Sequence, residues 1–206
     1  MDSRSVTRLA ALAGICGPII FGLTLAVLTF VKYDFLRSLG WNPLTAPTFD
    51  WPSGLALGAY GWIMTTIFII SGGLIIFFAF GLFPLLPHFP VSRAACLLLA
   101  ASGLALMGLA FTTDPTIRST PATWHGRLHD ASFVMLGLTL LPAMLLLGIT
   151  FRRDKRWINL LFYTFLTLAL IFPSFWLKGV AFYVFLGAIL VWMEVIALRL
   201  YKLIPK

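Results

Sequence analysis

The side chains best suited to chemistry lie in one short stretch, Trp124 to Asp130, which reads Trp-His-Gly-Arg-Leu-His-Asp. His125 and His129 are four residues apart, so on a helix their imidazoles share one face. Two imidazoles so placed can bind a divalent metal together with a loop carboxylate, and zinc there would activate a bound water for hydrolysis. The loop carboxylates that could serve as third ligand are Asp114, which we favour, Asp34 and Asp50.

The same stretch also supports chemistry without a metal. His125 or His129 can act as a base beside Asp130, while Arg127 holds a lipid phosphate or a carboxylate at the helix N-terminus, where the dipole favours anions. A purely structural interpretation stays open, because Arg127 and Asp130 are three residues apart and can pair with each other. Haem is not expected, since imidazoles on one helix face cannot bracket a haem and no Cys-x-x-Cys-His motif is present.

These polar residues belong to a chain that is otherwise strongly apolar. Hydrophobic residues make up 60% and charged residues 11% of its 206 residues, and the mean hydropathy is +0.98. Long apolar stretches, each near the roughly 20 residues that cross a bilayer, predict an all-α integral membrane protein. We expect a single domain over 1–206, a six-transmembrane-helix bundle. The predicted spans are 9–31, 61–86, 94–112, 124–150, 157–177 and 180–200.

The positive charge follows the predicted spans rather than forming a nucleic-acid surface. Of the 15 basic residues, ten fall at breaks on one side of the six spans and five on the other. By the positive-inside rule this places the N and C termini in the cytoplasm and the protein in the cell inner or plasma membrane. The basic cluster from Arg152 to Arg156 should contact anionic lipid headgroups. Nucleic acid is therefore not an expected partner.

The first outer loop, 32–60, is rich in proline, glycine and aromatic residues. Loops of this length are usually functional or disordered, and the aromatic content favours a segment packed at the membrane surface. We expect it to lie over the outer ends of the helices and partly cover a polar pocket. The predicted lining of that pocket is Asp34, Asp50, Asp114, His125, Arg127, His129 and Asp130.

Two stretches resemble an uncharacterised bacterial and archaeal membrane family, domain of unknown function 998. They are Pro52 to Trp62, which reads Pro-Ser-Gly-Leu-Ala-Leu-Gly-Ala-Tyr-Gly-Trp, and Phe111 to Pro115 with the downstream His125 to Asp130. The resemblance implies a six-helix membrane protein and supplies no reaction. The family often has Ser-Glu where this chain has Ser53-Gly54, so a catalytic role for that acid does not carry over. The first loop also looks longer than usual, with 41–50 as the extra segment.

Two functions remain open from the sequence, which does not decide whether the protein is an enzyme. The first is an outer-face pocket that binds a lipid headgroup or other amphiphile, with hydrolysis or transfer at the headgroup as its chemistry. The alternative is a non-catalytic accessory subunit of a larger respiratory or photosynthetic membrane complex, whose 19 Phe and seven Trp pack against lipid, pigment or partner helices. A transporter has less support, since inverted repeats are not visible and Glu194 is the one acid clearly inside a span, Asp130 being in the polar first turns at the outer interface.

Overall fold

The computed structural model describes residues 3–47, 50–114, 123–177 and 179–204, and these are almost entirely helical. Within them the β-structure amounts to one isolated bridge between Asn42 and Ala46. The long helices are α1 (Ser3–Val31), α4 (Gly61–Leu82), α5 (Pro90–Gly108), α6 (Trp124–Phe151), α7 (Asn159–Leu177) and α8 (Ala181–Leu203). The short ones are α2 (Tyr33–Ser38), α3 (Asp50–Gly54) and the 3₁₀ turn η1 (Phe83–Leu85).

Five of the long helices, α1, α4, α5, α6 and α8, are long and apolar enough to cross a membrane. Over its described side chains α7 counts as a shorter apolar helix, Asn159–Ser174. The prediction of an all-α, multi-pass membrane protein is thus supported with five candidate spans, and the sixth span stays a prediction. The third predicted span, 94–112, lies about one turn too late, because α5 begins at Pro90, where proline suits the first helical turn.

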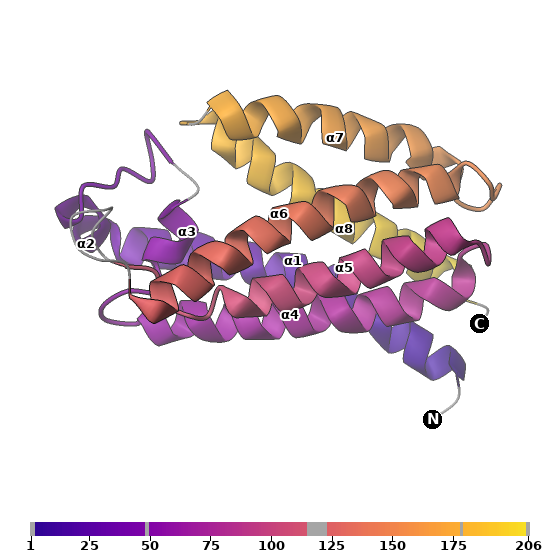
Figure 1. Cartoon of the computed structure of the whole chain (residues 1–206), viewed down its shortest axis with the longest axis horizontal. Coiled ribbons are helices and arrows are strands. Elements are labelled where there is room, and N and C mark those ends of the chain that lie inside the picture. Colours follow the sequence, from indigo (N-terminus) through magenta and orange to yellow (C-terminus); the bar gives the residue numbers. More distant parts are fainter. Residues whose placement is uncertain (1–2, 48–49, 115–122, 178, 205–206) are drawn as a thin grey trace.

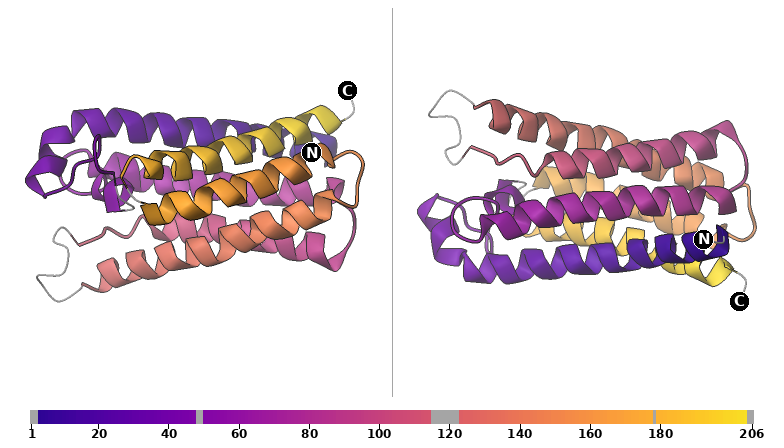
Figure 2. Two further views of the ribbon diagram at one scale, coloured as in Figure 1. Left: turned by 90° about the horizontal axis from the view of Figure 1, so that it is seen from above. Right: turned by 90° about the horizontal axis from the view of Figure 1, so that it is seen from below.

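The long helices pack as a closed ring, in which each contacts the next along the chain and α8 returns to α1 (Figures 1 and 2). Glycine permits a close approach between α4 and α5: a Cβ added to Gly72 would lie 2.3 Å from the Gly103 carbonyl oxygen. The space between these helices is lined by residues of every long helix.

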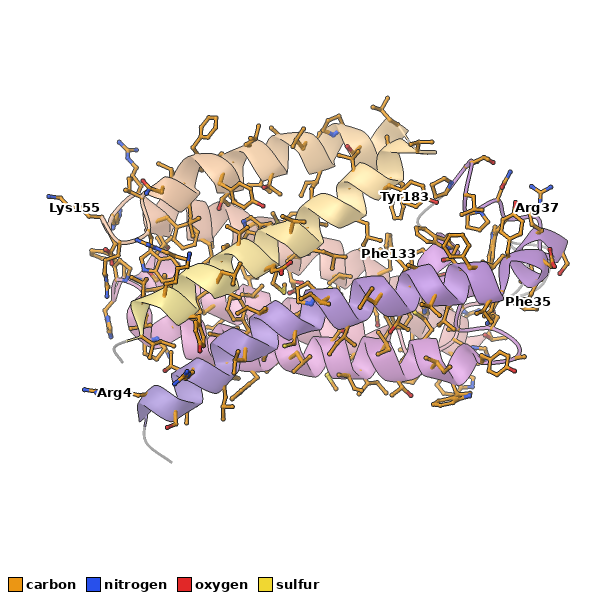
Figure 3. All side chains as sticks on the ribbon, turned by 180° about the vertical axis from the view of Figure 1, so that it is seen from behind. Arg4, Phe35, Arg37, Phe133, Lys155 and Tyr183 are labelled. Atoms are coloured by element: carbon orange, nitrogen blue, oxygen red, sulfur yellow. The ribbon has the colours of Figure 1, made fainter. Side chains whose placement is uncertain are left out.

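The two ends of the bundle differ in character. Both chain termini lie at one end, which we call the terminal end, and α2 and α3 lie at the other, the loop end (Figure 1). Figure 3 shows the basic Arg4 and Lys155 at the terminal end. There Arg156 forms an ion pair of 2.7 Å with Asp154, and the Arg199 guanidinium donates to the backbone carbonyl of Arg156. The basic residues therefore hold this end of the bundle together.

The predicted outer loop is packed against the bundle at the loop end. Leu36, Trp41, Trp51 and Leu55 are all buried there in one hydrophobic cluster with residues of α1, α4 and α8. The Tyr183 hydroxyl of α8 donates a hydrogen bond to the carbonyl of Pro43. The loop thus reaches across the helix ends as expected, and it carries two short helices that the sequence did not predict.

Candidate functional site

Helix α3 is fixed against the end of α1 by side chains of α1 and of the residue that follows it. The indole nitrogen of Trp51 donates to the Thr29 hydroxyl at 2.9 Å. The Lys32 ammonium donates to the carbonyl of Leu55 at 2.7 Å and also to the carbonyl of Leu57. Only 4% of Lys32 is exposed, and this burial lowers the pKa of its ammonium. These contacts hold the intervening Ser53 in a defined position.

Ser53 is hydrogen-bonded to a histidine of α6. Its Oγ lies 2.7 Å from Nε2 of His129, and both residues are buried, with 6% and 3% exposed. The other ring nitrogen, Nδ1, lies 2.6 Å from the Phe111 carbonyl oxygen and 3.1 Å from that of Leu109. Carbonyl oxygens only accept, so this network assigns the hydrogen of the neutral ring to Nδ1. Nε2 then accepts the Ser53 hydroxyl hydrogen, which is the arrangement of a nucleophile and its base.

Local sequence explains why these two side chains meet. Beside Ser53, a Cβ on Gly54 would lie 1.9 Å from the Trp41 ring, so glycine lets the buried indole pack against α3. On the other side, the amides of Leu109 and Phe111 close the end of α5 by donating to the carbonyls of Leu106 and Gly108. Leu109 and Phe111 belong to the turn that follows α5, and their carbonyls face His129 in the second turn of α6.

His125 belongs to a separate cluster at the start of α6. Its Nδ1 lies 2.8 Å from the Thr112 carbonyl oxygen and 3.1 Å from the Thr123 hydroxyl. Thr123 caps the helix by accepting from the Gly126 amide, and it donates to Asp114 through both its hydroxyl (2.6 Å) and its amide (3.1 Å). The hydroxyl bond is the main cause that lowers the pKa of Asp114, assisted by the amide bond and the charge of His125.

This second cluster is a helix cap rather than part of the Ser53 pair. A Cβ on Gly126 would lie 2.3 Å from the Asp114 carboxylate, so glycine is needed for the carboxylate to sit over the first turn. The cluster joins the end of the segment after α5 to the beginning of α6, on either side of residues 115–122, which lie outside the described residues.

Three other predicted residues, whose side chains the structure describes, do not join either cluster. Asp34, Arg127 and Asp130 are exposed, and in the described part of the chain no ion pair links Arg127 to Asp130. The side chain of Asp50 lies outside what the structure describes. Of the seven predicted residues, the structure describes the side chains of six. It places one in a buried pair, two in a helix cap and three on the exposed surface.

The predicted metal-ligand set, His125, His129 and Asp114, is not assembled. Among the described residues no group of three His, Cys, Asp or Glu side chains is close enough to hold a metal ion. The physical reason is that both nitrogens of His129 already have partners, Ser53 on one side and two backbone carbonyls on the other.

A cavity of about 820 Å³ lies between the helices, lined by residues from all six long helices and by Pro52 and Ser53. It is partly open at the surface of the bundle, where the lining residues Leu138 and Phe172 are exposed. Figure 3 shows one lining residue, Phe133, between the helices. The polar side chains of the lining are the three serines Ser53, Ser71 and Ser102. The rest of the lining is apolar, because the helix faces around the cavity carry leucine, isoleucine and phenylalanine. This cavity differs from the aspartate-lined pocket expected under the first loop, which stays a prediction.

Two of these serines differ in their hydrogen bonding. Ser102 Oγ donates to the Leu99 carbonyl of its own helix at 2.7 Å. Ser71, in the middle of α4, is 4% exposed, and its Oγ has no hydrogen-bond partner within the described structure. Ser71 therefore lines the cavity with a hydroxyl that is available for a hydrogen bond.

Sequence reasoning did not select Ser53, Lys32 or Ser71. Ser53 lies inside the family-like stretch Pro52 to Trp62, and that stretch was the available signal for it. Nothing comparable marked Lys32 or Ser71, whose importance comes from burial in the folded protein.

The fold and the cavity define an all-α, multi-pass membrane protein with a buried serine–histidine pair at the rim of an apolar chamber. The family model described as "Protein of unknown function (DUF998)" matches residues 20–200, and the chain belongs to this family. The resemblance seen in the sequence is thereby confirmed. No curated protein and no solved structure matches the chain.

Proposed function

We propose that this protein binds a membrane amphiphile, with the hydrocarbon chain in the central cavity and the polar end beside Ser53 and His129. The observation that carries this proposal is the apolar chamber of about 820 Å³. Its volume falls in the range of small-molecule sites, about 300–1,000 Å³. Such a site combines a large apolar lining with few polar groups, which is the composition found here.

In a binding site within a membrane, the hydrophobic effect contributes little to the selectivity for one amphiphile over another. A chain that moves from lipid into the cavity gains little from the hydrophobic effect, because lipid tails are as apolar as leucine. Shape and polar contacts then decide which amphiphile binds. The unpartnered Ser71 hydroxyl supports occupancy, since a buried hydroxyl without a partner costs about 1–3 kcal/mol.

We further propose that the chain crosses the cell inner or plasma membrane six times, with both termini in the cytoplasm. The charge distribution supports this orientation, because the basic residues concentrate at the terminal end. The loop end, with α3 and the Ser53–His129 pair, then faces outward. The amphiphile would enter from the outer leaflet, with its headgroup at the level of α3.

A cavity-filling substitution tests the binding proposal. Gly137 on α6 lines the cavity, and a Cβ there meets nothing within 4 Å, so Gly137→Leu fills the chamber without a backbone clash. Gly73→Leu is the matched control, because Gly73 on α4 has equally open space and does not line the cavity. We expect Gly137→Leu to weaken binding about tenfold or more, equivalent to about 1.4 kcal/mol, and Gly73→Leu to leave it unchanged.

The measurement is native mass spectrometry of the purified proteins titrated with phosphatidylglycerol and phosphatidylethanolamine. Equal lipid binding by the wild type, Gly137→Leu and Gly73→Leu would overturn the proposal, since lipid would then attach only to the outer surface. Saturable binding that Gly137→Leu alone removes would support it.

An accessory role in a larger membrane complex is the second proposal. Large exposed rings on α4 and α7, among them Trp62, Phe80 and Phe162, offer surface for partner helices. Lipid covers such rings equally well, so we rank this role below amphiphile binding. Extraction in a mild detergent followed by sizing separates the two, because a stoichiometric large assembly would favour the accessory role and a lone particle would contradict it.

A further inference from the structure

We propose that Ser53 is a nucleophile and His129 its general base, and that together they transfer the acyl group of a lipid ester held in the cavity. This inference rests on the proposed function, because the cavity supplies the acyl chain. The juxtaposition that carries it is the contact of 2.7 Å between Ser53 Oγ and His129 Nε2 at the wall of that cavity.

The geometry meets the requirements for an activated serine. A nucleophile and its base must lie within about 2.6–3.2 Å, and the base must be oriented by a third group. Here the third group is a pair of backbone carbonyls, those of Leu109 and Phe111, which hold His129 with its hydrogen on Nδ1. A carboxylate fixes the same tautomer in Ser-His-Asp triads. Carbonyl oxygens also accept from the imidazolium that forms when the base takes a proton.

The surroundings favour reaction with a lipid over reaction with a soluble ester. Ser53 and His129 are both buried, and Ser53 lines the apolar chamber. An ester whose acyl chain occupies the chamber has its carbonyl carbon near the wall that carries Ser53 Oγ. Binding then replaces a bimolecular encounter by a held geometry, which is a major source of rate enhancement.

The proposed reaction balances in two steps. Ser53 Oγ attacks the ester carbonyl carbon, its proton passes to His129 Nε2, and the bond to the alcohol oxygen breaks as that proton is delivered to the leaving alcohol. The acyl group is then an ester of Ser53. A water molecule, or the hydroxyl of a second lipid, gives its proton to His129 Nε2 and attacks the same carbonyl. Ser53 is released with its proton, and the product is a carboxylic acid or a new ester.

A long-chain alkyl fluorophosphonate tests the nucleophile directly in the purified full-length protein. Ser53 Oγ attacks phosphorus, fluoride leaves, and the adduct adds the probe mass minus HF. We expect one adduct on wild-type protein, mapped to Ser53 by peptide mass spectrometry. The matched control Ser102→Ala removes a cavity serine whose hydroxyl bonds its own helix, and it should label as the wild type does. Ser53→Ala should not label, and His129→Gln should label about 100-fold more slowly, in the range of general-base effects.

The outcomes separate this inference from the proposed function. If wild-type protein binds lipid in the titration above but forms no adduct, the nucleophile assignment is wrong and the binding proposal stands. An adduct on Ser71 or Ser102 instead of Ser53 also overturns the assignment. If neither lipid binding nor labelling occurs, the binding proposal and the nucleophile assignment are both wrong. The wild-type result does not depend on whether any variant folds.

Discussion

Two histidines four residues apart perform different tasks in this protein. Both lie near the start of α6, but they form hydrogen bonds with different backbone carbonyls of the segment that follows α5. His125 bonds the Thr112 carbonyl in the helix cap, whereas His129 bonds the carbonyls of Leu109 and Phe111 and turns its free nitrogen toward Ser53. Although His125 and His129 lie on one helix face, they do not belong to a group of metal-binding side chains among the described residues.

Asp114 gives a prediction about pH. Its pKa is lowered from 3.8 in the folded protein, so the carboxylate stabilises the fold at pH values above 3.8, and this stabilisation is lost as pH falls through the lower, folded value. We expect the unfolding temperature of the detergent-solubilised protein to fall in that acid range. Asp114→Asn should lower the unfolding temperature at neutral pH and flatten its dependence on acid, as measured by thermal unfolding.

Asp130→Asn is the control for the cap. It makes the same charge change on α6 at an exposed position outside the cap. We expect its unfolding temperature and its acid profile to match the wild type. If Asp130→Asn and Asp114→Asn behaved alike, net charge rather than the cap at Thr123 would explain the effect.

Among the elements, α3 depends most on distant contacts. With only five residues, it is too short to persist by its own hydrogen bonds, because helix nucleation is costly. Trp51 and Lys32 tie it to α1, and Ser53 ties it to α6. The position of the nucleophile is therefore set by the packing of three segments rather than by α3 itself.

Lys32→Met tests this anchoring. The substitution keeps an unbranched apolar stem but removes the donors to the carbonyls of Leu55 and Leu57. Hydrogen bonds to charged groups contribute about 1.5–3 kcal/mol each, so the loss of two predicts a destabilisation of about 3–6 kcal/mol. We also expect a slower reaction of Ser53 with the fluorophosphonate. The readouts are the free energy of unfolding from denaturant titration and the labelling rate.

Arg37→Met provides the matched control for Lys32→Met. Arg37 is exposed on α2 at the same end of the bundle, so its replacement removes the same charge without removing a buried donor. A similar loss of stability in both variants would contradict the anchoring role of Lys32.

The long helices were largely predictable from hydropathy, and the small ones were not. The predicted spans begin at the observed first residues of α4 and α6, Gly61 and Trp124. Helices α2 and α3 gave no signal, since tertiary contacts rather than local preference stabilise them. Ser53 and His129 are separated by 76 positions, so only the folded chain could show that they meet.

At the scale of the whole molecule, the charge asymmetry predicts which end faces the cytoplasm. Arg37 lies at the loop end and Lys155 at the terminal end, and both are exposed (Figure 3). In a background without native cysteines, we expect Arg37→Cys to react with a membrane-impermeant maleimide on intact cells. Lys155→Cys should react only after the membrane is permeabilised.

These two cysteine variants control for each other. Each replaces one exposed basic residue, so a difference in labelling reports the side of the membrane rather than the chemistry of the thiol. The opposite pattern would invert the proposed orientation and place the Ser53–His129 pair at the cytoplasmic leaflet. The cavity and the pair themselves do not depend on that outcome.

The contact between Gly54 and the indole of Trp41 has a consequence for the rest of the family. The ring occupies the volume that any side chain at position 54 would enter. Relatives with a glutamate at the equivalent of Gly54 must therefore carry a smaller residue, or a shorter loop, at the equivalent of Trp41. We expect the two positions to co-vary across an alignment. Relatives with tryptophan at the equivalent of Trp41 should lack glutamate at the equivalent of Gly54, next to the same serine.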